Sequence, residues 1–141
     1  MTVSIYLTFD GNCREALSFY CKVFETDFNM ISTFNDSPEP FDMPDEEKNQ
    51  VMHASLNIGN NVLMGSDQGD SSRAFISGNN FHISVDGESR EQVDSWFGQL
   101  SEGGDVTMPL QETFWGSYFG SCTDRFGINW MVSHEVEQTD S

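Results

Sequence analysis

Two stretches of the chain repeat one another without a gap. Residues 5–24 read IYLTFDGNCREALSFYCKVF, and residues 81–100 read FHISVDGESREQVDSWFGQL. At this offset the Asp-Gly pair at 10–11 falls on the Asp-Gly pair at 86–87. Each copy predicts a short alternating strand, a turn and an amphipathic helix. Because the period is longer than that of a solenoid repeat, the pattern indicates two copies of one supersecondary module.

Length and charge limit what these modules can do. A chain of 141 residues fits one domain, or two small halves that share a core. The net charge is −17, with only 6 Lys and Arg residues. Such a chain repels the phosphate backbone and gains nothing from counterion release, so we expect no nucleic-acid partner. It repels an anionic membrane surface for the same reason.

The ends and the cysteines favour a cytoplasmic protein. The first residues, MTVSIYLTF, contain no basic segment followed by a long apolar run, so no secretory signal or membrane span is predicted. Cys13, Cys21 and Cys122 are odd in number and have no metal-ligand spacing, which indicates free thiols. Cys13 stands in the first turn of the predicted helix, where the dipole is expected to lower its pKa.

The first module is predicted from alternation along the chain. In residues 2–9, Leu7 and Phe9 share one face and Tyr6 and Thr8 the other, as in a strand that packs against helices on one side. Asn12 predicts a helix N-cap, and the helix is expected to run to about residue 25. Further strands are predicted at 26–34, 50–57 and 62–66.

Between these strands, residues 35–49 form a polar, acidic stretch containing Pro38, Pro40 and Pro44. We expect no regular structure here and interpret the stretch as a lid or flap. Phe41 and Met43 could reach into a pocket or simply fix the loop to the domain.

The second module repeats the plan. A strand is expected at 81–85, a helix capped by Ser89 and ended by Gly103 and Gly104, and strands at 106–113, 118–122 and 128–134. The prediction is one α+β domain: module 1 at about 1–67, a linker at about 68–78, module 2 at about 79–134 and an acidic tail at 135–141. Two βαβββ modules would form an open, incompletely closed mixed-sheet barrel with a concave cleft.

Three segments carry a family resemblance: the first repeat copy, MHASLNIGNNVLMGSD, and MPLQETFWGSYFGSCTDRFGINWMV. They are similar to the PhnB-like group, also called the demethylubiquinone methyltransferase-like domain, of the vicinal oxygen chelate superfamily. That superfamily includes glyoxalase I, bleomycin- and fosfomycin-resistance proteins and extradiol dioxygenases. The resemblance covers all but the flap and the tail. It implies paired βαβββ modules around a cleft, and often a homodimer.

The resemblance also implies where a metal would bind. Metal-dependent members place ligands on the first and last strands of each module, which here gives His82, Tyr6 (or Ile5, if the register slips by one residue), Met64 and Met131. Thioethers are poor ligands for Zn, Mg, Mn or Fe(II), so the usual metal site is not expected and no cofactor is predicted. A rearranged divalent-metal site from His53, His82 and Glu112 is the alternative.

Candidate site residues follow from these strands. His82 and His53 are candidates for acid or base catalysis, the alternative for each being a histidine that only lines the cleft. Glu112, beside aromatic residues, is a further candidate acid or base, the alternatives being a solvated turn carboxylate or a pair with an Arg. The predicted ligand-binding cleft is lined by Tyr6, Thr8, Met64, Trp115, Phe119 and Met131.

Three functions are open from the sequence. The first is a small-molecule-binding protein without the usual metal, whose ligand is not specified. The second is a metal-dependent lyase, isomerase or dioxygenase with the rearranged ligands. The third is a ligand-sequestering or dimerisation module without catalysis.

Overall fold

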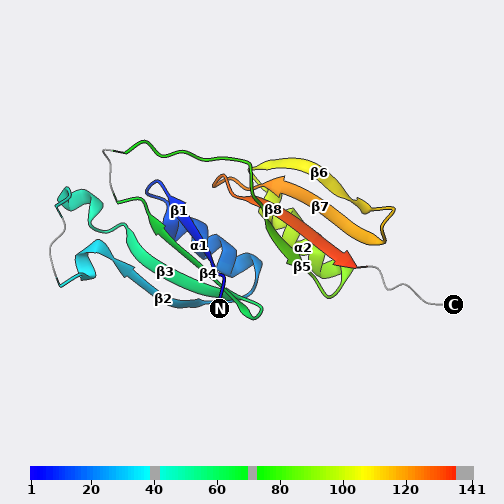
Figure 1. Ribbon diagram of the computed structural model, residues 1–141, viewed down its shortest axis with the longest axis horizontal. Helices are drawn as coiled ribbons and strands as arrows, with labels where there is room; N and C mark the ends of the chain where they lie inside the picture. Colours follow the sequence, from blue (N-terminus) through cyan, green and yellow to red (C-terminus); the bar gives the residue numbers. More distant parts are fainter. Residues whose placement is uncertain (39–41, 70–72, 136–141) are drawn as a thin grey trace. The chain divides into compact units, whose positions relative to one another are not determined.

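The computed structural model describes residues 1–38, 42–69 and 73–135. The chain divides into two units, Met1–Ile76 and Ser77–Ser141. Each unit contains one four-stranded mixed sheet with a single α-helix lying across one of its faces (Figure 1).

The first unit has the strand order β1-β4-β3-β2. Strand β1 pairs in parallel with β4, and the other two pairings are antiparallel. The elements are β1 (Ile5–Phe9), α1 (Cys13–Val23), β2 (Phe28–Thr33), β3 (Val51–Ile58) and β4 (Asn61–Asp67). The parallel β1–β4 pair is possible because α1 and two further strands separate β1 from β4 along the chain.

Helix α1 covers the face of this sheet that carries Leu7 and Phe9, both buried as the alternation predicts. The sheet comes close to the helix at Gly65, where an added Cβ would lie 3.3 Å from Leu17 Cδ1. Gly65 pairs with Leu7 on one side and Ala54 on the other, so these residues face the helix. Their neighbours in each strand therefore point to the opposite, helix-free face.

The start of α1 is held differently from the prediction. The Asn12 side chain makes no capping hydrogen bond. Instead the backbone N–H of Cys13 donates to Asp67 Oδ1 at 2.9 Å, and that of Val51 donates to Asp67 Oδ2 at 2.8 Å. Asn12 is the N-cap residue as predicted, but the expected capping bond from its side chain is absent, and a buried carboxylate from β4 accepts the N–H of the first turn instead.

The proline-rich stretch contains two single turns of 3₁₀ helix, η1 (Phe34–Asp36) and η2 (Asp45–Glu47). The expectation of no regular structure was therefore wrong at these two places. Pro44 directly precedes η2, where a proline does not disturb the turn because no backbone N–H is needed from it. Met43 is half-buried, while Phe41 lies outside the described residues.

The second unit has the strand order β5-β8-β7-β6, with β5 parallel to β8. Its elements are β5 (Ile83–Asp86), α2 (Arg90–Ser101), β6 (Asp105–Glu112), β7 (Ser117–Thr123) and β8 (Asn129–Glu135). Ser89 caps α2 as predicted, accepting a hydrogen bond from the Gln92 N–H at 3.1 Å. A Cβ at Gly104 would lie 2.1 Å from the Thr123 carbonyl oxygen, so only glycine fits after the helix.

A buried carboxylate also organises the second unit. Asp124, 3% exposed, accepts hydrogen bonds from the N–H groups of Phe126 and Ile128 and from Trp130 Nε1. Trp130 is fully buried and is one of the largest side chains of the core. The turn between β7 and β8 is thereby tied to the interior of the unit.

The α+β class and the two βαβββ modules are confirmed, and neither four-stranded sheet closes into a barrel. The predicted strands correspond to β1 to β8 within a few residues at each end. Among the described residues, no helix has the length and apolar character needed to cross a membrane.

Candidate functional site

The helix-free face of the first sheet has the composition of a binding surface. The strand register places Tyr6, Met64, Ser55 and Met30 in one row across β1, β4, β3 and β2. Thr8 and Ser66 form a pair in the next row, and His53 and Ser32 another. We call these eight residues the unit 1 face. It combines hydroxyl groups, two thioethers, one phenol and one imidazole.

Tyr6 and His53 form a pair on this face. The Tyr6 hydroxyl lies 3.2 Å from His53 Nδ1, and the two rings are stacked with centroids 5.7 Å apart and an interplanar angle of 23°. Tyr6 is 47% exposed and His53 is half-buried. Since Nδ1 meets Tyr6, the second ring nitrogen, Nε2, is the one that can bond to a ligand.

Several members of this face were not among the predicted site residues. Met30, Ser32, Ser55 and Ser66 join Tyr6, Thr8, His53 and Met64 only once the strands are paired. The alternation in each strand was readable, but the order β1-β4-β3-β2 was needed to bring them together. A bulge between Phe28 and Met30 also shifts the register, so that Phe28 pairs with Leu56 and Met30 with Ser55. Phe28 and Met30 therefore lie on opposite faces of the sheet.

The helix-free face of the second sheet carries the remaining predicted cleft residues. Gly120 faces α2, since an added Cβ would lie 3.0 Å from Phe97, so Phe119 and Ser121 point away from the helix. Met131 pairs with both Ser84 and Ser121, and Ser121 Oγ lies 2.6 Å from Thr107 Oγ1. This face therefore repeats the combination of thioether and hydroxyls.

An aromatic group lies at one end of this second face. The ring of Trp115 lies 6.3 Å from that of Phe119 and 4.9 Å from that of Phe114, both in edge-on arrangements. Trp115 is 56% exposed and Phe114 is 98% exposed. The predicted apolar, aromatic character is thus present in unit 2.

His82 lies just before β5 and is exposed. The next residue, Ile83, pairs with Trp130, which puts His82 level with Asn129 rather than with Met131. Met64, in contrast, pairs directly with Tyr6. The resemblance assigned Met64 and Met131 to equivalent ligand positions. In the structure Met64 lies opposite Tyr6, whereas Met131 lies two residues beyond the position opposite His82.

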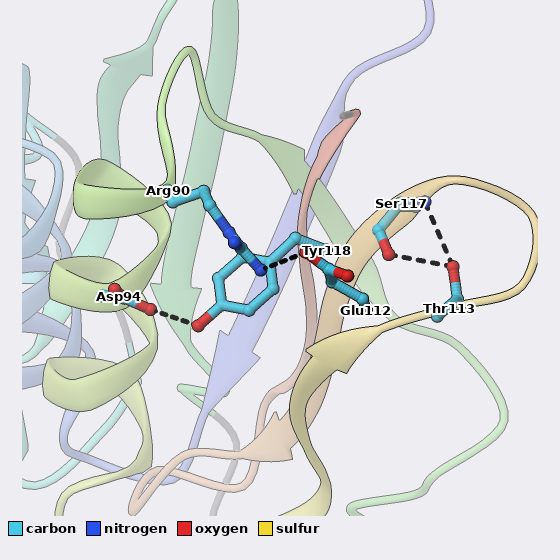
Figure 2. A network of polar contacts seen from close by, with 6 residues as sticks. All are labelled: Arg90, Asp94, Glu112, Thr113, Ser117 and Tyr118. Atoms are coloured by element: carbon cyan, nitrogen blue, oxygen red, sulfur yellow. Dashed lines mark hydrogen bonds and ion pairs between the residues drawn. The ribbon is translucent and has the colours of Figure 1, made fainter. Parts of the chain in front are cut away.

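Glu112 belongs to a surface network on the α2 side of the second sheet (Figure 2). Its Oε1 lies 3.0 Å from Arg90 Nη2, and the Arg90 guanidinium sits 4.2 Å from the centre of the Tyr118 ring. The Tyr118 hydroxyl donates to Asp94 Oδ1 at 2.6 Å, and this bond raises the pKa of Tyr118. The sequence left three interpretations of Glu112 open: an acid or base, a solvated turn carboxylate, or a partner of an arginine. The structure shows the third, with Arg90 as the partner.

The residues of these faces do not fit a divalent metal. The donors that β1 and β4 bring together are the phenol of Tyr6 and the thioether of Met64, and neither is a ligand that Zn, Mg or Mn prefers. Within residues 1–38, 42–69 and 73–135, no group of three His, Cys, Asp or Glu side chains is arranged to hold an ion. Glu112 faces α2, whereas His82 precedes β5 at the other edge of the same sheet.

The three cysteines lie in surroundings that raise the pKa of their thiols. Cys13 is fully buried, and burial together with the nearby Asp67 carboxylate raises its pKa from 9.0 to about 12. The expectation that the helix dipole lowers this pKa was wrong, because loss of solvent and a negative neighbour outweigh it. Burial also raises the pKa of Cys122 to about 11, and that of the half-buried Cys21 is raised as well.

Comparison with known proteins identifies the family to which the chain belongs. Residues 1–133 match the model of the family described as 3-demethylubiquinone-9 3-methyltransferase. The chain belongs to this family. Protein YjdN of Escherichia coli is 32% identical to it over 98% of both chains. This confirms the PhnB-like group to which the three segments were similar.

Solved structures agree on the fold. Protein PA1353 from Pseudomonas aeruginosa is 39% identical, with a TM-score of 0.86 over 97% of this chain and 99% of that one. A glyoxalase/bleomycin resistance protein/dioxygenase family enzyme from Burkholderia phytofirmans has a TM-score of 0.64 at 16% identity, over 93% of this chain and 97% of that one. The second likeness concerns the fold alone and agrees with the vicinal oxygen chelate superfamily.

Proposed function

We propose that this family member is a glyoxalase-like protein that binds a small organic molecule on the unit 1 face, without a resident divalent metal. The observation that carries the proposal is the Tyr6–His53 pair, with its hydroxyl–imidazole contact of 3.2 Å on the sheet face opposite α1. A half-exposed, stacked pair of rings offers a flat apolar surface together with hydrogen-bonding groups.

The arrangement of this pair supports binding in a defined orientation. Tyr6 restrains the His53 ring through one nitrogen, so a ligand that bonds to the other nitrogen meets a ring already held in place. The Met64 and Met30 thioethers flank Ser55 in the same row and provide adaptable apolar contact. Any acid or base catalysis on this face would rest on His53.

The proposal is tested by NMR with ¹³C-methyl-labelled methionine. The chain has 7 methionines. Met30 and Met64 lie on the unit 1 face, while Met52 lies on the opposite face by strand alternation. In a screen of small organic fragments, we expect hits that shift the Met30 and Met64 methyl signals and leave Met52 in place.

Two substitutions on the face and one matched control complete this test. Tyr6→Phe and His53→Gln should each weaken the binding of a hit by roughly fivefold to thirtyfold, the effect of losing one hydrogen bond of about 1–2 kcal/mol. Tyr118→Phe removes the same hydroxyl from the α2 side of unit 2 and should leave the affinity unchanged. If neither Tyr6→Phe nor His53→Gln changes the affinity of the hits, the proposed site is refuted.

The absence of a metal is tested separately. Purified protein should contain well below one equivalent of any divalent ion, because the donors on the unit 1 face are a phenol and a thioether. About half an equivalent or more that only a chelator removes, with loss of hit binding on removal, would favour a metal-dependent enzyme instead.

We also propose a homodimer. Supporting it are the superfamily's frequent dimerisation and the exposed apolar side chains of the edge strand β6, Val106 at 50% and Met108 at 38% exposure. Sedimentation equilibrium should give twice the mass of 15.9 kDa. A monomer at all accessible concentrations would contradict this part of the proposal.

A further inference from the structure

The unit 1 face carries almost no charge although the chain is strongly acidic. The chain has 23 Asp and Glu residues. In β1, β2, β3 and β4, all of which the structure describes, the one carboxylate is Asp67. Asp67 is 3% exposed and accepts hydrogen bonds on the α1 side, from Cys13 and Val51. The acidic residues are thus kept off the face that the ligand would meet.

The basic residues are also placed elsewhere. The chain has 6 Lys and Arg residues, and all of them lie on helices, turns or loops: Arg14, Lys22, Lys48, Arg73, Arg90 and Arg125. Lys48 pairs with Asp45, and Arg90 with Glu112. No strand of the unit 1 sheet contains a lysine or an arginine, so an anionic ligand would find no cationic side chain in the two rows that include Tyr6 and His53.

We propose that the ligand is an uncharged organic molecule and that the unit 1 face selects against anions such as carboxylates and phosphonates. The inference rests on the proposed function and adds the chemical class of the ligand. An ion that leaves water for an uncharged surface loses hydration without gaining a counter-charge. An anion additionally meets the long-range field of a chain with a net charge of −17.

The groups on the face indicate what an uncharged ligand would offer in return. Tyr6 and His53 present stacked rings, Met64 and Met30 thioethers, and Thr8, Ser32, Ser55 and Ser66 hydroxyls. The matching ligand has a planar or apolar body and neutral oxygen or nitrogen groups, such as a hydroxyl or a carbonyl, that exchange hydrogen bonds with hydroxyl side chains.

The test uses three probes with the same ring: benzyl alcohol, benzoate and benzylammonium. Each is titrated into protein labelled with ¹³C-methyl methionine, and the Met30 and Met64 signals are followed. The titrations are repeated at about 1 M NaCl, where a Debye length of ~3 Å removes the long-range field and leaves the local effect of the face. Benzyl alcohol should bind at least roughly tenfold more tightly than either ion at high salt.

Charge placed on the face should reverse the preference. In Met64→Lys a cation stands beside Tyr6 and Ser55, and we expect benzoate to bind more tightly than benzyl alcohol, with Met30 as the reporter. Met64→Leu, without the charge, should keep the wild-type order. Gly98→Lys adds the same charge to α2, where a Cβ has open space, and should also keep the wild-type order.

The outcomes separate this inference from the proposed function. Benzoate or benzylammonium binding as tightly as benzyl alcohol at high salt, with shifts at Met30 and Met64, would overturn the inference and leave the binding face intact. The same holds if Gly98→Lys improves benzoate binding as much as Met64→Lys does. No shift at Met30 or Met64 from any of the three probes would overturn the proposed function, and the inference with it.

Discussion

At the scale of single residues, two buried carboxylates fix the position of the backbone through hydrogen bonds to its N–H groups. Asp67 joins the first turn of α1 to the start of β3 through two N–H groups. Asp124 receives two N–H groups and the Trp130 indole. Each of these bonds satisfies an N–H group that would otherwise be buried without a partner.

Replacing either carboxylate with the isosteric amide should destabilise its unit. Asp67→Asn keeps the shape but offers one acceptor oxygen instead of two, so one of the N–H groups of Cys13 and Val51 loses its partner. We expect a loss of about 1–3 kcal/mol in the free energy of unfolding, measured by urea denaturation, and a similar loss for Asp124→Asn. Asp10→Asn, the same change at an exposed position, should stay within about 0.5 kcal/mol. Equal effects of the three variants would show that the bonds contribute little.

The buried thiols make stability fall in alkaline solution. The folded chain holds the Cys13 proton up to a pKa of about 12, whereas the unfolded chain releases it near 9.0. Between these values the folded state binds more protons, so the free energy of unfolding decreases as the pH rises, by at most about 1.4 kcal/mol per pH unit for this thiol. Urea unfolding at several pH values should show a flatter decline for Cys13→Ala than for Cys21→Ala. Parallel declines would contradict the assignment.

At the scale of elements, α2 and the β6–β7 hairpin are linked by the network in Figure 2. Glu112 ends β6, Arg90 begins α2, and Tyr118 on β7 lies against both helix residues Arg90 and Asp94. Thr113 and Ser117 close the hairpin with hydrogen bonds between the Thr113 hydroxyl and the Ser117 backbone. The network is largely exposed, which limits how much it can stabilise.

Glu112→Gln tests the structural interpretation of this residue. Because the ion pair with Arg90 is solvated, we expect a change of at most about 0.5 kcal/mol in the free energy of unfolding. The same variant should bind fragments on the unit 1 face as the wild type does, as followed by the methionine methyl signals. Loss of binding without loss of stability would instead support Glu112 as a functional residue.

The elements were largely predictable, while the contacts that join them were not. Alternation at Leu7 and Phe9 and the cap at Ser89 are local signals, and each led to the correct strand or helix. The Asp67 contact with Cys13 spans 54 residues, and nothing near Asp67, at the boundary of the predicted linker, marked it as a helix cap. The Tyr6–His53 pair likewise crosses from β1 to β3, so it needed the strand order before it could be seen.

At the scale of the whole molecule, a net charge of −17 on 141 residues opposes the compact state through self-repulsion. Salt reduces this repulsion, since the Debye length shortens from ~30 Å at about 0.01 M to ~10 Å at about 0.1 M ionic strength. With 6 Lys and Arg residues against 23 Asp and Glu residues, attractive pairs are too few to offset this gain when salt weakens them.

The melting temperature should therefore rise by several degrees between about 0.01 and 0.5 M NaCl, as measured by calorimetry. Potassium and sodium chloride should have the same effect, because screening does not depend on the identity of the ion. A melting temperature that falls or stays constant would show that attractive pairs, and not repulsion, dominate the electrostatics.

The uncharged unit 1 face also affects how copies of the protein associate in solution. An apolar, hydroxyl-bearing sheet surface is suited to associate with another copy of itself, and we expect the excess of carboxylates elsewhere on the chain to oppose this association. Near the isoelectric point of about 4.1 that barrier disappears, and the faces with Tyr6, Met30 and Met64 become free to meet. Light scattering should rise as the pH approaches this value, and less so in Met64→Lys; equal scattering by the two proteins would show that other surfaces cause the association. The acidity that makes the chain soluble would then be what allows a neutral binding surface to stay exposed.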